Sequence, residues 1–314
     1  MTVFLSTLNQ MGFLVLLIAI GYILGKVGAV PDNAARVLSK LENNVFVPAL
    51  VIGTFMSNFT VSKITSYRDL LLCGLVVMTI MAFVGSGLAK LFSKDAYIRK
   101  IYTYGLAFAN FGFMGNAVVE ALFPDIFLEY LIFVIPFWIF IYVWGVPKLL
   151  IPSDDKSSSF FSKIKPFINP MFIGMIIGMI LGLTSLPLPD FISKSVDSLG
   201  DCMSPLAMLL TGITVAKIDL KKTFQKISIY LLSLVRLIAI PAITILALYF
   251  IDLPKTIEIC IVCGLSMPLG LNTIVVPGAY GLDTSEASGM ALISHLMSCL
   301  TIPVVFMAAE LWIF

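Results

Sequence analysis

Long apolar runs separated by short polar segments extend along the whole chain. A helix needs about 20 mostly apolar residues to cross a bilayer, and runs of this kind predict ten membrane spans. Their length and continuity favour helices over the strands of a barrel, so we expect an all-α membrane protein. The predicted spans, numbered one to ten, cover residues 8–26, 41–56, 70–92, 101–122, 126–147, 167–186, 196–216, 227–251, 257–280 and 285–314.

The composition agrees with this pattern. The chain has 314 residues, of which 59% are hydrophobic and 12% charged, and its mean hydropathy is +1.03. A soluble domain is about 45–50% apolar and about 25% charged, so a water-soluble globule is excluded. The first apolar run lacks a basic leading segment and a small-residue cleavage site, and we expect it to be a retained span rather than a cleaved signal peptide.

The positions of the basic residues predict the orientation. Most of the 20 lysine and arginine residues lie in the loops after odd-numbered spans. The loops after even-numbered spans hold only Lys63, Arg68, Lys194 and Lys255, while Arg236 lies within the eighth span. Basic loops remain in the cytoplasm. The sequence therefore predicts a multi-pass protein of the cell (inner) membrane with both termini extracytoplasmic.

A repeat relates the two halves of the chain. The first span contains IGYILG at 20–25, and the sixth contains IGMILG at 177–182. Two further pairs keep the same or nearly the same separation: Pro48 with Pro205, and Asn116 with Asn272. Each match is weak alone, because glycine and proline are common in membrane helices. Their shared offset indicates a true repeat.

The repeat predicts a division into two five-span halves, residues 1–147 and 167–314, joined by a cytoplasmic linker at 148–166. Because five is odd, the second half enters the membrane from the opposite side. Inverted repeats with interrupted helices at matching places are typical of secondary transporters.

The fourth and ninth spans contain such interruptions, NFGFMGN and SMPLGLN. Proline inside a helix costs roughly 3 kcal/mol, and broken backbone at membrane depth is tolerated only where it is buried or lines a cavity. If the interruptions meet, the N-terminal ends of the half-helices suit an anion, whereas the unwound carbonyls and the asparagine amides suit a cation or hydroxyl groups. The alternative is a pair of kinks that only fit helix packing. The candidate substrate-binding residues are Asn110, Asn116, Ser266, Pro268, Gly270 and Asn272.

These residues resemble the auxin efflux carrier family, which contains plant auxin exporters and bacterial malate permease-like proteins. One departure is Asn116, where many relatives have proline after the FxG turn. The resemblance covers nearly the whole chain and rests on IGYILGKVGAVPDNAARVLSKLENNVFVPAL, NFGFMGN, NPMFIGMIIGMILG, SPLAMLLTGITVA, RLIAIP, SMPLGLN and YGLDTSEAS.

The resemblance implies a fold related to bile acid:sodium symporters. Spans 1, 2, 6 and 7 would form a scaffold, and spans 3–5 and 8–10 a transport domain that moves past it like an elevator. Spans 4 and 9 would cross at the centre of that domain. The implied partners are a small organic carboxylate, the lipid bilayer and a second copy of the chain in a homodimer, with no nucleic acid. A malate-like dicarboxylate and an auxin-like aromatic carboxylate both remain open.

Three ionisable residues are candidates for ion coupling. His295, the only histidine, can titrate near neutral pH, and the alternative is a neutral histidine bonded between helices. Arg236 either pairs with a carboxylate, contacts backbone carbonyls or meets the substrate. Glu120 either helps a cation site or is a solvated helix end.

Three more polar residues flank the prolines of spans 2 and 7 and are candidates for the substrate path. They are Asn43, Asn44 and Asp201. The alternative for these residues is interhelical hydrogen bonding, worth about 0.6 kcal/mol per contact on average.

Other functions receive less support. SMPLGLN has no acid and no glutamine, which argues against the sodium sites of the related symporters, although sodium-coupled symport of an organic anion stays an alternative. A channel or sensor would need a ring of carbonyls or charges. An enzyme would need a nucleophile with its base, or metal ligands. We expect no metal and no cofactor, since Cys260 and Cys263 form a single CxxC without a partner motif.

Overall fold

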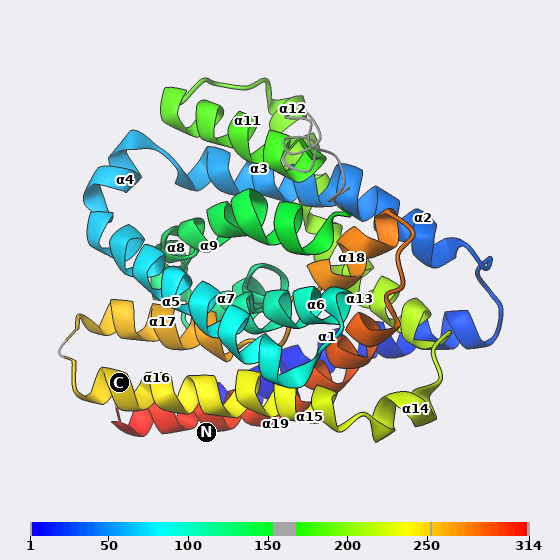
Figure 1. Ribbon diagram of the computed structural model, residues 1–314. Coiled ribbons are helices and arrows are strands. Elements are labelled where there is room, and N and C mark those ends of the chain that lie inside the picture. The colour runs from blue at the N-terminus through cyan, green and yellow to red at the C-terminus, as the bar shows by residue number, and fades with distance from the viewer. Residues whose placement is uncertain (1, 153–167, 252, 313–314) are drawn as a thin grey trace, which may run out of the picture.

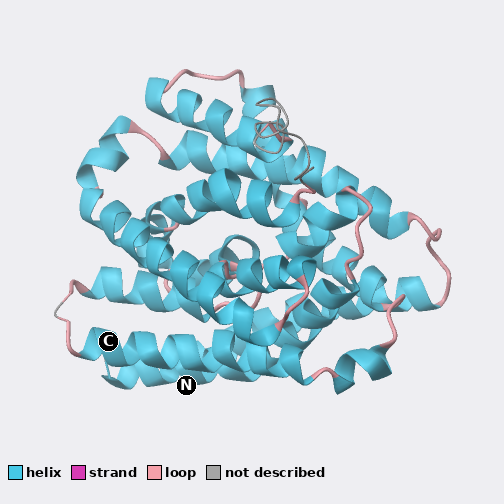
Figure 2. Cartoon of the chain, in the orientation of Figure 1, coloured by secondary structure: helices cyan, strands magenta, loops and turns pink. Residues whose placement is uncertain are grey.

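The computed structural model describes residues 2–152, 168–251 and 253–312 (Figure 1). The described chain consists of helices joined by loops (Figure 2). In Figure 1, α3 and α11 lie along one side, α15, α16 and α19 lie along the opposite side, and α6, α7, α17 and α18 lie between them. Most of the linker predicted at 148–166, from residue 153 onward, lies outside the described residues.

The helices of the first half are α1 (Thr2–Lys26), α2 (Ala34–Leu41), η1 (Glu42–Phe46), α3 (Val47–Asn58), α4 (Val61–Ser66), α5 (Arg68–Phe92), α6 (Ala96–Ala107), η2 (Phe111–Gly115), α7 (Asn116–Leu122), η3 (Pro124–Ile126), α8 (Phe127–Phe133), α9 (Ile135–Phe140) and η4 (Ile141–Leu150). Those of the second half are α11 (Pro170–Thr184), α12 (Asp190–Asp201), α13 (Met203–Val215), α14 (Leu220–Gln225), α15 (Ile227–Leu234), η6 (Val235–Ala239), α16 (Ile240–Tyr249), α17 (Lys255–Ser266), α18 (Asn272–Ala279) and α19 (Ser285–Trp312).

Five continuous helical stretches are long and apolar enough to cross a membrane, and two shorter helices are similarly apolar. The five are Arg68–Phe92, Pro124–Leu150, Asp190–Val215, Ile227–Tyr249 and Ser285–Trp312, and the shorter two are Met11–Lys26 and Pro170–Thr184. The expected all-α membrane protein is therefore present, while the count of ten spans stays a prediction.

The fourth and ninth predicted spans are each divided into two helical pieces. Helix α6 ends at Ala107 and the next helical piece begins at Phe111; α17 ends at Ser266 and α18 begins at Asn272. In the second interruption the sequence supplies the reason. Pro268 has no backbone N–H to give to a helix, and it disfavours helical backbone at the residue before it.

Glycines bring two helix pairs into close contact. A Cβ atom on Gly21 of α1 would lie 2.2 Å from the carbonyl oxygen of Leu209 in α13. A Cβ atom on Gly178 of α11 would lie 2.8 Å from the carbonyl oxygen of Ile52 in α3. Gly21 and Gly178 occupy equivalent places in the IGYILG and IGMILG sequences. The matching sequences therefore lie in two helix pairs that pack closely, α1 with α13 and α11 with α3.

Two widened π-helical turns carry buried charged residues. The turn η1 contains Glu42 and ends two residues before Pro48, and η6 contains Arg236 and ends two residues before Pro241. Proline removes a hydrogen bond and crowds the preceding turn, and a π-bulge is one way for a helix to absorb this distortion. Both Glu42 and Arg236 are fully buried.

Candidate functional site

The two interrupted segments meet and pair through their backbones. The N–H group of Asn110 donates to the carbonyl oxygen of Pro268 at 2.7 Å, and the N–H group of Gly270 donates to that of Phe108 at 3.2 Å. These bonds flank an isolated antiparallel bridge between Ala109 and Leu269. Backbone groups that a broken helix leaves open at membrane depth must be satisfied within the protein. The pairing supplies that satisfaction and joins the interruptions into one structural unit, which we call the crossing.

Arg236 binds one backbone carbonyl group next to the crossing on each of the two interrupted segments. Its Nε donates to the carbonyl oxygen of Met267 at 3.2 Å, and its Nη1 donates to that of Leu106 at 3.1 Å. These carbonyls lie at the C-terminal ends of α17 and α6, where the helix dipole is partially negative. The residue is 0% exposed, and its Nη2 atom has no partner among the described residues. The sequence left three alternatives for Arg236: a carboxylate partner, backbone carbonyls or the substrate. The geometry shows contact with backbone carbonyls.

His295 of α19 lies against Asn110 at the start of the second half-helix. The Nδ2 atom of Asn110 is 3.0 Å from the Nε2 atom of His295, and the Nδ1 atom of His295 is 2.8 Å from the carbonyl oxygen of Ala291. A carbonyl only accepts, so Nδ1 carries a proton and donates to it. The amide nitrogen then donates to the unprotonated Nε2. With this amide orientation, which is assigned from the hydrogen-bond network, the imidazole is neutral.

Asn272 makes a related contact on the other side of the crossing. Its Nδ2 atom donates to the hydroxyl of Tyr104 at 2.8 Å. The side-chain oxygens of Asn110 and Asn272 have no hydrogen-bond partner within the described residues, and the two residues are only 1% and 3% exposed. Unpaired buried polar atoms are uncommon and costly. Their presence at one place indicates a site that awaits a polar ligand or a rearrangement.

A small cavity adjoins these side chains. Its volume is about 10 Å³, which is close to the minimum for one water molecule. An organic anion would therefore need helix movement to enter. The residues that line it are Tyr104, Ala109, Asn110, Phe111, Gly112, Trp138, Ile141, Gly270, Leu271 and Asn272.

Three of the candidate binding residues thus line the cavity, and three do not. Asn110, Gly270 and Asn272 belong to the lining. Pro268 contributes its carbonyl to the backbone pairing. The hydroxyl of Ser266 donates to the carbonyl of Val262 at 2.6 Å, within its own helix, and Asn116 lies at the start of α7, outside the lining.

The candidate path residues and Glu120 lie away from the crossing. Asn43 donates to the side chain of Asn44 at 3.3 Å, and Asn44 donates to the carbonyl of Lys40 at 2.8 Å. Asp201 and Glu120 are exposed. None of these residues belongs to the cavity lining.

Sequence reasoning missed Tyr104, Trp138 and Glu42. The two aromatic residues stand in apolar runs and give no separate signal. Glu42 is 0% exposed, and neither of its carboxyl oxygens has a partner among the described residues. An ionisable residue inside a predicted span is a functional candidate by default, so Glu42, the second residue of the second predicted span, could have been found.

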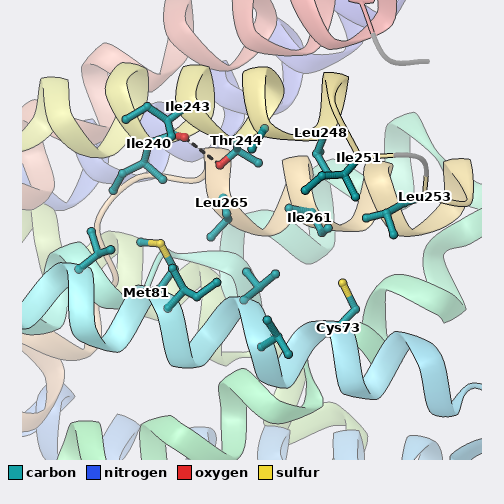
Figure 3. A pocket seen from close by; sticks show the side chains of 15 residues that line it. Cys73, Met81, Ile240, Ile243, Thr244, Leu248, Ile251, Leu253, Ile261 and Leu265 are labelled. Atoms are coloured by element: carbon teal, nitrogen blue, oxygen red, sulfur yellow. Dashed lines mark hydrogen bonds between the residues drawn. The ribbon is translucent and has the colours of Figure 1, made fainter.

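A larger cavity lies elsewhere, between α5 and the pair α16–α17 (Figure 3). Its volume is about 380 Å³, and its walls are almost entirely aliphatic side chains such as Met81, Ile240 and Leu265. The hydroxyl of Thr244 is satisfied by the carbonyl of Ile240 at 2.8 Å. A carboxylate would find no partner here, so this cavity is not a candidate anion site.

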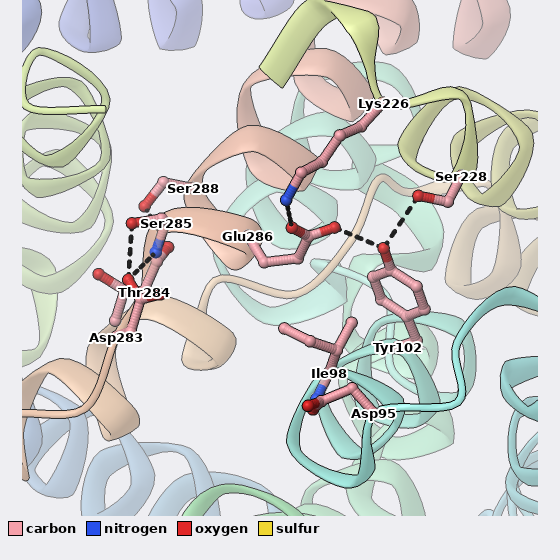
Figure 4. Close-up of polar contacts among 10 residues, drawn as sticks. All are labelled: Asp95, Ile98, Tyr102, Lys226, Ser228, Asp283, Thr284, Ser285, Glu286 and Ser288. Carbon is pink, nitrogen blue, oxygen red and sulfur yellow. Dashed lines mark hydrogen bonds and ion pairs between the residues drawn. The ribbon is translucent and has the colours of Figure 1, made fainter. Parts of the chain in front are cut away.

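A polar cluster joins three helices at one end of the molecule (Figure 4). The hydroxyl of Tyr102 in α6 donates to Glu286 of α19 at 2.5 Å and lies 3.2 Å from the hydroxyl of Ser228 in α15. Lys226, immediately before α15, pairs with the other carboxyl oxygen of Glu286. This cluster fastens the beginnings of α15 and α19 to α6.

The loop before α19 adds a local stabilising contact. One carboxyl oxygen of Asp283 accepts the hydroxyl of Ser285 at 2.6 Å and its backbone N–H at 2.9 Å. These hydrogen bonds hold the pKa of the Asp283 carboxyl below its ordinary value. An ionised carboxylate is favourable at a helix N-terminus, so Asp283 stabilises the start of α19.

Comparison with known families decides the assignment. The family model described as Membrane transport protein matches residues 6–159 and again residues 153–306. The chain belongs to this family, the auxin efflux carrier family. The resemblance drawn from the sequence is confirmed, and the protein is a multi-pass membrane transporter, not an enzyme. The double match hints at an internal repeat. No match was found among curated proteins.

Proposed function

We propose that this member of the auxin efflux carrier family carries a small organic anion across the membrane and binds it at the crossing. The observation that carries the proposal is a set of buried polar atoms at the crossing that have no partner among the described residues. They are the side-chain oxygens of Asn110 and Asn272, which line the cavity, and Nη2 of Arg236, whose other nitrogens bind the carbonyls of Met267 and Leu106. A malate-like dicarboxylate is our first choice of substrate, and an auxin-like aromatic carboxylate is the second.

The charges near the crossing favour an anion. Arg236 brings a positive charge, and the helical pieces that begin at Phe111 and Asn272 direct backbone N–H groups toward the crossing. Within the described part of the chain, none of the residues lining the cavity carries a carboxylate. Carbonyls at half-helix ends are natural ligands for a coupling cation. Here the guanidinium of Arg236 already binds two of them, which supports transport without sodium.

Helix packing supports a division into a fixed and a moving part. The glycine contacts hold α1 to α13 and α11 to α3, which together correspond to predicted spans 1, 2, 6 and 7. We propose that these spans form the scaffold, and that spans 3–5 and 8–10 move past it as an elevator. The small volume at the crossing supports a mechanism in which substrate enters only after such movement.

The remaining features of the topology are part of the same proposal. We propose ten spans in two inverted halves, residues 1–147 and 167–314 around the linker 148–166, in the cell (inner) membrane. Helices α1 and α19 pack side by side, with Ser298 donating to the sulfur of Met11 at 3.9 Å. This contact between the first and last helices is compatible with both termini on one, extracytoplasmic, face. A homodimer would form through the scaffold.

Counterflow in proteoliposomes tests the proposal. Purified protein is reconstituted with unlabelled malate inside, labelled malate is added outside without sodium, and we expect transient accumulation of label. Asn272→Ala should abolish this accumulation, because it removes an amide from the cavity. The matched control is Asn58→Ala, which removes a buried amide that bonds only within and next to the end of α3.

The outcomes separate the parts of the proposal. Accumulation with malate supports a dicarboxylate carrier, and accumulation only with aromatic monocarboxylates supports the second substrate. Normal flux in folded Asn272→Ala protein would remove Asn272 from the binding site. Label that enters only as a linear leak, with no transient accumulation, would contradict a carrier mechanism.

A further inference from the structure

The contact between His295 and Asn110 links a titratable group directly to the cavity at the crossing. His295 is 1% exposed and belongs to α19, whereas Asn110 lines the cavity. In the neutral imidazole, Nε2 accepts from the amide nitrogen of Asn110, and the amide oxygen of Asn110 is left without a partner. The protonation state of His295 therefore determines which end of the Asn110 amide can face the cavity.

Protonation of His295 reverses this arrangement. A proton on Nε2 places two donors opposite each other, 3.0 Å apart, which is repulsive. Turning the Asn110 amide by half a turn removes the conflict, because its oxygen then accepts from the new Nε2–H bond. The turn breaks no other side-chain hydrogen bond that the described residues make, since the oxygen is unpartnered beforehand. The amide nitrogen, with two N–H donors, then takes the place of the oxygen.

The consequence at the cavity is a change from acceptor to donor. A carboxylate has only acceptor groups, so it is repelled by the amide oxygen and attracted by the amide nitrogen. An anion therefore binds best when His295 is protonated. By linkage, the bound anion must favour protonation of His295 to the same degree.

The surrounding charges reinforce this linkage. Arg236, on η6, binds carbonyls next to the crossing, and η6 packs against α19, which carries His295. A second buried cation near the crossing is unfavourable unless an anion is present. The other charged residues on helices that pack against α19, or on α19 itself, lie at helix ends or on the short helix α14. They are Lys26, Lys221, Lys222, Lys255, Glu258 and Glu310, together with Glu286, which is paired with Lys226. The remaining titratable side chains of these helices are tyrosines and cysteines.

We propose that His295 and Asn110 form the proton-binding switch of this carrier, so that one proton moves with each anion bound at the crossing. The proton comes from water on the side where the anion enters, forms an N–H bond with the Nε2 lone pair, and returns to water on the other side. No redox change is involved. This inference rests on the proposed anion carrier and adds its coupling ion.

The test compares malate uptake with and without an inward proton gradient. For the wild type, we expect the gradient to accelerate labelled malate uptake, and an internal pH dye to report proton entry with malate. His295→Gln keeps an acceptor for the Asn110 amide but cannot take up a proton. In His295→Gln, the ratio of the malate uptake rate with the gradient to the rate without it should therefore fall to about one, whatever the absolute rates are. The control is Glu42→Gln, which removes the titratable proton of a buried carboxyl group outside the cavity lining and should retain the gradient response.

If His295→Gln does not transport malate, a binding measurement still tests the proposal. Calorimetric titration with malate in buffers of different ionisation enthalpy reports proton uptake on binding. We expect proton uptake in the wild type and its loss in His295→Gln. The proposal is overturned if His295→Gln keeps the gradient response or the proton uptake, or if Glu42→Gln alone loses them. If the wild type shows counterflow but its uptake rate does not change with the proton gradient, this inference alone is contradicted. If no carboxylate shows counterflow, the proposed function itself is contradicted.

Discussion

Replacing Arg236 by methionine or by lysine separates the charge at the crossing from its anchoring role. Methionine fills much of the same volume without charge, so the substrate loses its cation. Lysine keeps the charge, but one ammonium cannot reproduce the geometry of a guanidinium that reaches two carbonyls, those of Met267 and Leu106. The two variants should therefore fail in different ways.

The magnitudes of two effects, the attraction between the charge and the anion and the hydrogen bonds to the two carbonyls, follow from general energies. An anion about 6 Å from the guanidinium, at an effective dielectric constant of about 20, gains about 3 kcal/mol, which corresponds to about 100-fold in affinity. Each hydrogen bond from the charged group to a carbonyl contributes about 1.5–3 kcal/mol. In Arg236→Met the loss of these bonds is offset by the several kcal/mol of desolvation that a buried cation requires. The free energy of unfolding should thus change little compared with the affinity.

The assay is the concentration dependence of malate counterflow, measured beside the thermal unfolding of each variant in detergent. We expect an apparent affinity about 100-fold weaker in Arg236→Met and less than tenfold weaker in Arg236→Lys, with the lower unfolding temperature in Arg236→Lys. Arg68→Met is the control, because Arg68 is exposed and pairs only with Asp69. If Arg236→Met aggregates, Arg236→Gln replaces it, since its amide still reaches one carbonyl. Wild-type affinity in a folded neutral variant would refute the assigned role of the charge.

Two further predictions concern the packing and the missed carboxyl group. Gly212→Ala should lower the free energy of unfolding by about 1–3 kcal/mol, because its Cβ would lie 2.1 Å from the carbonyl oxygen of Ile18. The control is Gly12→Ala, where an added Cβ would have nothing within 4 Å. Equal unfolding temperatures of the two variants would contradict the close helix contact. Glu42→Gln should unfold at or above the wild-type temperature near neutral pH, since a buried carboxyl without a partner is held neutral. A marked drop in that temperature would instead indicate an ionised and paired Glu42.

Much of the helical architecture follows from local signals. Hydropathy identified the apolar runs, and Pro268 with Gly270 marked the interruption that separates α17 from α18. The boundaries were less accurate. The second span was predicted to begin at residue 41, whereas helical backbone already begins at Ala34. Helix α2 carries the basic residues Arg36 and Lys40 at exposed positions, so its average hydropathy hides a helix that tertiary contacts with α13 and α18 stabilise.

The candidate site was only partly predictable. Asn110 and Asn272, two of the candidate binding residues, line the cavity where the interruptions meet, and their role in binding stays a prediction. Ser266 and Asn116 have the same kind of signal, yet neither lines the cavity. The direction of a side chain depends on how the two half-helices are rotated against each other, and no local pattern contains that rotation.

The amino-acid sequence by itself determined that this protein is a multi-pass helical membrane protein, and its family motifs identified it as a transporter. The helical membrane character depends on how apolar each segment is and on where proline and glycine interrupt it, which is local information. Only the tertiary structure decided that Arg236 binds the ends of two half-helices, that His295 meets Asn110, and that Glu42 has no partner among the described residues. These contacts join residues far apart in the chain, and in a low-dielectric interior such long-range contacts determine which polar groups are satisfied.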